Sequence, residues 1–294
     1  MRDPSGLRDP KGLLAGIASV RRVRRVVRRH PLFVLALIAT GALLAGAIFA
    51  PALAPYPPDE INFAEKLDPP SRAHLFGTDA LGQDIFSRSL YGARTSLAIG
   101  GLVIAVALAL GVPLGLAAGY FGGRTDEIIM RLTDVMLGFP PLLLPMAIAA
   151  ALGGSVFNAM VAIAISWFPW YVRLLRAEVL VLRQEAFVEA SRALGAGSPW
   201  ILWRHLLPNA MAPVIVQASM DVGYAILAAA SLSFIGLGAQ PPAVEWGLMV
   251  TTARVYFLDF WWTATFPGLA IFVAVLAFNL LGDGLRDLLD PRLK

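Results

Sequence analysis

The sequence has no cysteine, few histidines and few charged residues, and these absences exclude several classes of protein. Without cysteine there is no disulfide and no thiolate metal site. The 3 histidines are scattered and share no ligand spacing, so we expect no metal site. None of the lysines (Lys11, Lys66 and Lys294) follows a glycine, as a phosphate-binding loop requires. The patterns His-Glu-x-x-His and Gly-x-Ser-x-Gly are also missing, so the sequence predicts neither a metalloprotease nor a serine hydrolase of those types.

Hydrophobic residues are abundant instead. They make up 57% of the 294 residues, charged residues make up 15%, and the mean hydropathy is +0.69. This composition is typical of an integral membrane protein. The apolar runs predict six membrane spans, at residues 32–54, 96–119, 132–152, 159–180, 209–237 and 263–281. An even number of spans places both termini on the same side of the membrane.

The distribution of positive charge predicts which side faces the cytoplasm. A basic tail, residues 1–31, precedes a first apolar run that is too long for a signal-peptide core, so we expect an uncleaved span with its amino end inside. In this layout 19 of the 24 Lys and Arg residues lie on the cytoplasmic side. Residues 55–94 then form an external loop, residues 95–281 a five-helix core, and residues 282–294 a cytoplasmic tail. Because topology explains the basic tail, no nucleic-acid partner is predicted.

Two features of the predicted spans concern packing. Gly111, Gly115 and Gly119 form a stripe of small residues in the second span, which is expected to let a neighbouring helix approach closely. Three prolines between residues 140 and 145 are expected to bend or break the third span, either as a packing irregularity or as the hinge of a gate.

A polar segment at residues 183–209 interrupts the apolar sequence between the fourth and fifth spans. Gln184 to Leu194 is a run of good helix formers with small alanine side chains on one face. Gly195 is suited to the left-handed conformation that ends a helix. Ser198 and Pro199 are predicted as the N-cap and first residue of a second short helix, which ends where the fifth span begins. Since this second helix is largely apolar, we expect it to be buried in a groove.

Acidic residues inside a membrane span are costly and therefore informative. Asp221 lies 13 residues after Pro208, or about 20 Å along the fifth span. Its carboxylate either lines a substrate path and meets a substrate's amino group, or pairs with a polar group of a partner subunit. The candidate path residues are Asp221, Gln217, Met220 and Tyr224. Asp134, by contrast, is expected to form a local pair with Arg131, one turn earlier.

Several motifs together resemble a known family. Glu189-Ala190-Ser191, Gly195 and Leu207-Pro208 resemble the EAA loop by which permease subunits of ABC importers dock onto their ATPase subunits, with Ser191 in place of a second alanine. The segment from His74 to Asp84 resembles the external segment of the C-type permease subunit of dipeptide, oligopeptide and nickel ABC importers, with Gln83 in place of a common arginine. Further matches to that subunit are Gly119 to Gly123, Ser231 to Gly238, Glu245 to Gly247, and Leu281 to Arg292.

The resemblance implies an all-α integral membrane protein with the six-span, type I ABC importer permease fold and both termini in the cytoplasm. It implies a place in the bacterial inner membrane and four kinds of partner: a homologous B-type permease, two ATP-binding subunits, an external solute-binding protein and the lipid bilayer. The subunit itself would be no enzyme and would hold no cofactor, because the ATPases bind ATP and Mg. The residues implied in ATPase docking are Glu185, Ala186, Glu189, Ala190, Ser191, Gly195, Ser198, Pro199, Trp200, Arg204, His205, Leu207 and Pro208.

In this mechanism the ATPases close on ATP and carry the second short helix with them as a lever, so that the flanking spans move as rigid bodies. Peptides are the expected cargo, with nickel or another small solute as the alternative. A secondary transporter or channel would also use buried charges and broken helices, but it would not need a docking loop. A scaffold without a path would give no uptake defect when deleted.

Overall fold

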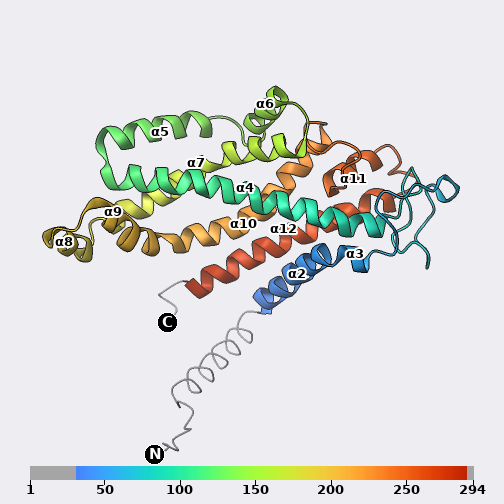
Figure 1. Cartoon of the computed structure of the whole chain (residues 1–294), viewed down its shortest axis with the longest axis horizontal. Coiled ribbons are helices and arrows are strands. Elements are labelled where there is room, and N and C mark those ends of the chain that lie inside the picture. The colour runs from blue at the N-terminus through green and yellow to red at the C-terminus, as the bar shows by residue number, and fades with distance from the viewer. Residues whose placement is uncertain (1–30, 290–294) are drawn as a thin grey trace, which may run out of the picture.

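The computed structural model describes residues 31–289, which form an elongated bundle of helices (Figure 1). Most of the predicted basic tail and the last residues of the predicted cytoplasmic tail lie outside the described residues. Within residues 31–289 there is no strand beyond a single bridge between Thr78 and Asp84. Five stretches are long and apolar enough to cross a membrane: Pro31–Ile48 (α2), Ile85–Phe121 (α4), Val156–Leu182 (α7), Ser198–Phe234 and Trp262–Leu289 (α12).

The first predicted span is divided into α2 and a short helix α3 (Ala50–Leu53). A segment of irregular structure with one turn of 3-10 helix, η1 (Phe63–Glu65), connects α3 to α4. α4 begins at Ile85, inside the region that the sequence assigned to the external loop, because the Asp84 side chain accepts a hydrogen bond from the Ser87 backbone N–H at 2.7 Å and caps the helix. With 37 residues, α4 is about 55 Å long and extends beyond the hydrocarbon layer.

The third predicted span is not one helix. It is divided into α5 (Gly123–Leu137) and the 10-residue α6 (Leu143–Leu152), which follow one another beside α7 (Figure 1). The break at residues 138–142 contains Pro140 and Pro141, which cannot donate the backbone hydrogen bonds that would continue α5. The predicted break of the third span is therefore confirmed.

Two ion pairs join α5 to α7. Asp126 accepts two hydrogen bonds from the Arg176 guanidinium, one of them at 2.6 Å from Nη2. Asp134 pairs with Arg173 at 2.6 Å. The expected pair between Asp134 and Arg131 is therefore wrong. Asp126 and Asp134 lie about two turns apart on the face of α5 that meets α7, whereas Arg131 pairs within its own helix, with Glu127.

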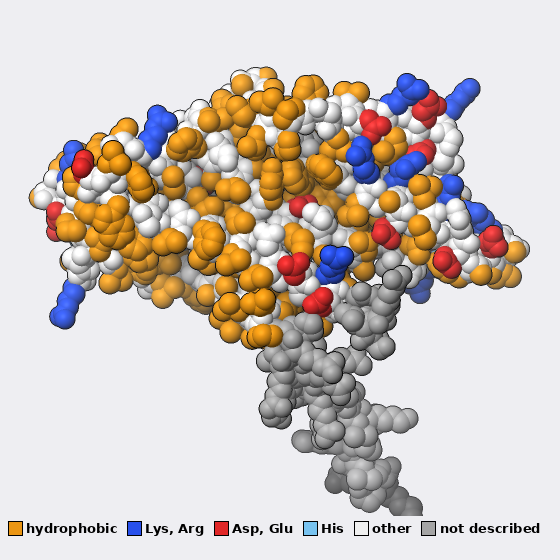
Figure 2. Space-filling model, turned by 180° about the vertical axis from the view of Figure 1, so that it is seen from behind, with side chains coloured by type: hydrophobic (Ala, Val, Ile, Leu, Met, Phe, Trp, Pro, Cys, Tyr) orange, Lys and Arg blue, Asp and Glu red, His pale blue; other side chains and the backbone are white. Residues whose placement is uncertain are grey.

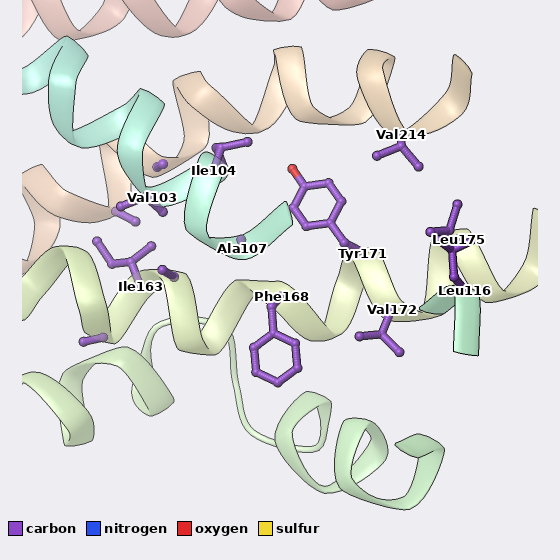
Figure 3. Close-up of a cluster of buried hydrophobic side chains, with 14 of the residues drawn as sticks. Val103, Ile104, Ala107, Leu116, Ile163, Phe168, Tyr171, Val172, Leu175 and Val214 are labelled. Carbon is purple, nitrogen blue, oxygen red and sulfur yellow. The ribbon is translucent and has the colours of Figure 1, made fainter. Parts of the chain in front are cut away.

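The glycine stripe of α4 packs directly on α7, as predicted. A Cβ atom added at Gly111 would lie 2.6 Å from Tyr171 Cβ, one at Gly115 would lie 2.8 Å from the Val172 carbonyl oxygen, and one at Gly119 would lie 2.7 Å from Val179 Cβ. The close approach brings side chains of α4, α7 and α10 (Leu207–Phe234) together in the main core (Figure 3).

A second cluster of buried residues joins α2, α4, α10 and α12 to the short helix α11 (Trp246–Ala253). Glu245 caps α11 and is only 1% exposed. Its carboxylate accepts hydrogen bonds from the backbone N–H groups of Gly247 and Leu248 at 2.8 and 2.9 Å. The sequence did not single out Glu245 as a cap, because its donors lie in a helix that the apolar runs do not reveal.

In the view of Figure 2, hydrophobic side chains cover most of the surface between the two ends, and charged side chains gather at the ends and in a small group near the middle of the lower edge. One end carries α8 (Ala186–Ala193), and the opposite end carries the irregular segment at residues 54–84 (Figure 1). The first turn of α2 and the last turn of α12 both point toward the end that carries α8 (Figure 1). A band of this kind, bounded by polar ends, is suited to a lipid bilayer.

Candidate functional site

The loop between α7 and α10 turns at Gly195, as the sequence predicted. Gly195 has φ +82°, in the left-handed region. Its N–H donates to the Arg192 carbonyl at 2.9 Å, and the Ala196 N–H donates to the Ser191 carbonyl at 3.0 Å. These are the two hydrogen bonds of a Schellman motif at the end of α8. A Cβ atom at Gly195 would meet nothing within 4 Å, so glycine is required here for its conformation and not for space.

The second helix is not the separate element that the sequence predicted. Its first residues, Ser198–Trp200 (α9), lead into a π-helical segment, Ile201–Leu206 (η2), which continues into α10 without a break. Pro208 has no N–H, and its ring would clash with the Arg204 carbonyl in an α-helix. The wider π spacing accommodates this proline, with the Leu207 N–H bonded to the Leu202 carbonyl. Proline therefore widens one turn here instead of ending the helix.

The predicted cap of the second helix also differs from the structure. Gly197 is the N-cap, and Ser198 is the first helical residue with no capping hydrogen bond from its side chain. The Ser198 hydroxyl instead accepts a hydrogen bond from the Tyr120 hydroxyl at 3.3 Å, which joins α9 to the end of α4. The Arg192 guanidinium lies 5.3 Å from the centre of the same tyrosine ring and joins α8 to it.

The residues 186–206, which we call the docking unit, are held as one body. Ser191 Oγ of α8 lies 3.2 Å from His205 Nε2 of η2. Three aliphatic side chains anchor the unit to the core: Val188, Ile201 and Leu206, each with an exposed fraction of 0%. The alanine face of α8 remains exposed, as its small side chains predict.

Large apolar side chains of the docking unit are nevertheless exposed. Leu194 is 89% exposed, Trp200 59% and Trp203 63%. The groove expected to bury the second helix is therefore not supplied by the described part of this chain. Of the thirteen residues predicted to dock, Ser191, Ser198, His205 and Leu207 are half-buried and the others are exposed. Leu194 and Trp203 were missed, because helical spacing alone does not show which apolar residues a turn leaves uncovered.

The predicted path residue Asp221 lies in a hydrogen-bonded cluster between α7 and α10. The residue is 5% exposed. Its Oδ2 accepts hydrogen bonds from Trp167 Nε1 at 2.9 Å and from the Tyr171 hydroxyl at 2.7 Å, both on α7. Its Oδ1 accepts a hydrogen bond from Gln217 Nε2 at 2.9 Å. Among residues 31–289, no Lys or Arg forms an ion pair with Asp221.

The structure brings three of the four predicted path residues together. Tyr224 joins Asp221 and Gln217 by stacking on the Trp167 ring, with ring centres 4.3 Å apart. Met220 points away to α12, where it packs against Gly282. Trp167 and Tyr171 were not predicted, because they lie 54 and 50 residues before Asp221 in the sequence and only the folded chain makes them neighbours.

Comparison with known proteins places the chain in a family. Residues 111–294 match the family model of the "binding-protein-dependent transport system inner membrane component". Residues 20–70 match the "N-terminal TM domain of oligopeptide transport permease C".

Curated relatives agree over most of their length. The probable D,D-dipeptide transport system permease protein DdpC of Escherichia coli is 50% identical over 91% of this chain and 90% of its own. The dipeptide transport system permease protein DppC of Alkalihalophilus pseudofirmus is 45% identical over 97% of this chain and 94% of its own. The glutathione transport system permease protein GsiD of Pectobacterium atrosepticum is 48% identical over 92% of this chain and 90% of its own.

A solved structure, an inward-facing conformation of the MetNI methionine ABC transporter, has a similar fold. The TM-score is 0.55 over 69% of this chain and 96% of that chain, with 18% sequence identity. At this identity the likeness concerns the fold alone. With the curated relatives and the family model, it completes the assignment: the chain is a multi-pass inner-membrane permease of the ABC transport type and belongs to the binding-protein-dependent transport system inner membrane component family.

Proposed function

We propose that this chain is one of two permease subunits of an ATP-driven importer of short peptides. It crosses the membrane six times, with both termini and the docking unit in the cytoplasm. A homologous B-type permease completes the path, two ATPase subunits bind the ATP and Mg, and an external binding protein delivers the cargo. The subunit itself holds no cofactor.

The sixth crossing is supplied by α5 and α6 together. α4 ends near the end of the bundle that carries α8, whereas α7 begins beside α6, past the middle of the bundle toward the opposite end (Figure 1). The stretch between Phe121 and Val156, where α5 and α6 run, connects the two and supports a crossing at this place. The excess of Lys and Arg in the segments at the α8 end supports a cytoplasmic position for that end.

The observation that carries the proposal is the continuity of the docking unit with a membrane helix. Ser198–Phe234 is one uninterrupted helical stretch of 37 residues, about 55 Å long. Its first turns carry the exposed Trp200 and Trp203, and its middle carries Asp221. A bound ATPase that displaces these tryptophans therefore moves the whole helix, including the part that carries Asp221. Indole rings have the large contact area that dominates protein interfaces.

The cargo is inferred from the relatives, whose names refer to D,D-dipeptides, dipeptides and glutathione, all of them short peptides. Nickel or another small solute remains the alternative cargo. A direct test reconstitutes the complex that co-purifies with this chain into liposomes that contain ATP. Uptake of radiolabelled alanyl-alanine, glutathione and nickel chloride is then measured with and without the binding protein.

We expect ATP-dependent uptake of a peptide that requires every partner and is abolished when the ATPases are removed. Uptake by the purified chain alone would overturn the proposal in favour of a secondary transporter. The orientation is tested independently with Leu194→Cys, since the chain contains no other cysteine. A membrane-impermeant maleimide should label this cysteine only when the cytoplasmic face is open. Labelling of intact spheroplasts would refute the orientation.

A further inference from the structure

We infer that Asp221 is a positioning residue that fastens α7 to α10, so that the two helices on either side of the docking unit move together. We call Asp221, Trp167 and Tyr171 the α7–α10 clamp. The inference rests on the proposed function, in which the docking unit receives motion from ATPases. It assigns Asp221 a role different from lining the substrate path.

The clamp has the geometry of a strong cross-link. One carboxylate oxygen on α10 accepts two hydrogen bonds from side chains one turn apart on α7, at 2.9 and 2.7 Å. Hydrogen bonds to a charged acceptor are stronger than bonds between neutral groups, and a site with low dielectric strengthens them further. Gln217 occupies the other oxygen from within α10 and fixes the orientation of the carboxylate. The charge is thus satisfied without a cation.

The two donors are themselves held in place from other directions. The Tyr171 side chain is fully buried, and its Cβ lies against Gly111 of α4, where a Cβ atom would approach to 2.6 Å. In Figure 3 its hydroxyl points from α7 toward α10. Trp167 stacks on Tyr224 of α10 at 4.3 Å, so the indole contacts α10 with its face as well as its N–H. Fixed donors make the cross-link stiff.

The position of the clamp gives it a mechanical consequence. α7 leads into the docking unit and the helix that continues as α10 leaves it, so a force on the unit reaches both helices. Without a cross-link, that force can slide α7 along α10. The two helices would then shift relative to each other instead of moving as one body. The clamp lies roughly 16 Å from the docking-unit end of α7 and roughly 35 Å along the helix from Ser198. The clamp therefore makes α7 and α10 move together near the middle of the membrane.

The burial of Asp221 argues against direct contact with cargo. With an exposed fraction of 5% and three donors already on its two oxygens, the carboxylate offers a substrate's amino group little access. Gln217 is exposed, in contrast, so a contact with cargo at this level of α10 would fall to that neighbour.

The test uses the complete reconstituted complex and compares uptake of alanyl-alanine with ATP hydrolysis. The variants are Asp221→Asn, which leaves a single acceptor oxygen, and Tyr171→Phe, which keeps the buried ring and removes only the hydroxyl. Ser166→Ala is the matched control, because the Ser166 hydroxyl donates to the Ala162 carbonyl of its own helix, at 2.7 Å, and within residues 31–289 it bonds to no other helix. We expect peptide imported per ATP hydrolysed to fall roughly five-fold or more in Asp221→Asn and in the same direction in Tyr171→Phe, with ATPase activity retained. Ser166→Ala should match the wild type.

A second measurement reports the movement itself. Spin labels on cysteines at Phe157 and Leu227, which are 70% and 45% exposed, lie on α7 and α10 beyond the clamp from the docking unit. In the wild type the distance between the labels should not change when the ATPases are trapped with vanadate. In Tyr171→Phe the distribution of distances between the labels should broaden or shift. This variant tests the clamp on its own if Asp221→Asn fails to assemble.

Two results would overturn the inference. One is an unchanged ratio of uptake to hydrolysis in both clamp variants. The other is a raised KM for alanyl-alanine, but not for its N-acetylated form, with an unchanged ratio, which would make Asp221 a cargo ligand. Failure of the proposed function would look different, because the wild-type complex would then show no ATP-driven uptake at all.

Discussion

Replacing Gly195 by valine tests the role of the docking unit most directly. The wild-type residue has φ +82° and forms the corner between α8 and α9. Valine has room for its side chain, because a Cβ atom would meet nothing within 4 Å. It has no comfortable conformation there, since the left-handed region brings Cβ close to the following carbonyl oxygen. The perturbation therefore acts on the corner alone and leaves the membrane helices untouched.

The free-energy cost of Gly195→Val can be worked out from the two ways in which the chain can respond. If the corner keeps its shape, a left-handed L-residue costs roughly 1–2 kcal/mol, and more when it is β-branched. If the corner relaxes, the hydrogen bonds from Gly195 to Arg192 and from Ala196 to Ser191 are lost, each worth about 0.5–1.5 kcal/mol. Either response costs about 1–3 kcal/mol, which corresponds to a roughly 5- to 150-fold loss of the docking-competent geometry.

The assay measures binding of the purified ATPase subunits to the permease pair in nanodiscs, together with uptake per ATP. Gly195→Val should weaken ATPase binding about 10-fold or more and uncouple hydrolysis from uptake, while membrane insertion stays normal. Gly195→Asn is the matched control, because asparagine tolerates the left-handed region, and it should bind nearly as the wild type does. Glu189→Lys, which reverses a charge on the exposed face of α8, should uncouple transport without bending the corner. Wild-type binding and uptake in Gly195→Val would refute the assignment of the docking unit.

Three further predictions follow from packing, exposure and charge. Gly115→Ala should lower the free energy of unfolding by about 1–3 kcal/mol, because its Cβ would lie 2.8 Å from the Val172 carbonyl oxygen, whereas Gly101→Ala, with nothing within 4 Å, should be neutral or stabilising. Equal thermal unfolding of these two variants in detergent would contradict the close contact between α4 and α7. Trp203→Ala should cost about 1.5–3 kcal/mol of ATPase binding if the interface buries the indole, and Phe157→Ala at the other end of the bundle should cost nothing. Asp126 accepts two hydrogen bonds from the Arg176 guanidinium, and this ion pair joins α5 to α7. Asp126→Asn should therefore unfold more readily than the wild type at pH 6, whereas Glu127→Gln, which loses only an exposed pair within α5, should unfold nearly as the wild type does. Equal unfolding of the two variants would disprove this account.

The apolar runs determined most of the architecture before any contact was known. Five of the six predicted spans correspond to helices long enough to cross a membrane, because about twenty apolar residues have no other stable environment. The glycine stripe of α4 was also readable, since small residues in a membrane helix have few uses besides close packing. The left-handed corner at Gly195 was predicted for a similar reason: glycine is the residue that adopts this conformation without strain.

The sequence failed where local rules compete with one another. Pro208 was predicted to separate two helices, but a single π-helical stretch joins them, because a wider turn removes the proline clash at lower cost than a break. Asp134 was predicted to pair with Arg131, because helical spacing reveals only neighbours one turn away in the same helix. In the folded chain its partner is Arg173 of α7.

A membrane protein with a polar segment that turns at Gly195 was readable from the residues alone, because hydrophobicity and glycine conformation are properties of single residues and short windows. The hydrogen-bond partners of Asp221, in contrast, become known from the folded chain. Its donors on α7 lie 50 or more residues away along the chain, and no local pattern specifies that they meet. Which apolar side chains of the docking unit stay exposed was decided in the same way, since burial depends on every helix that packs nearby.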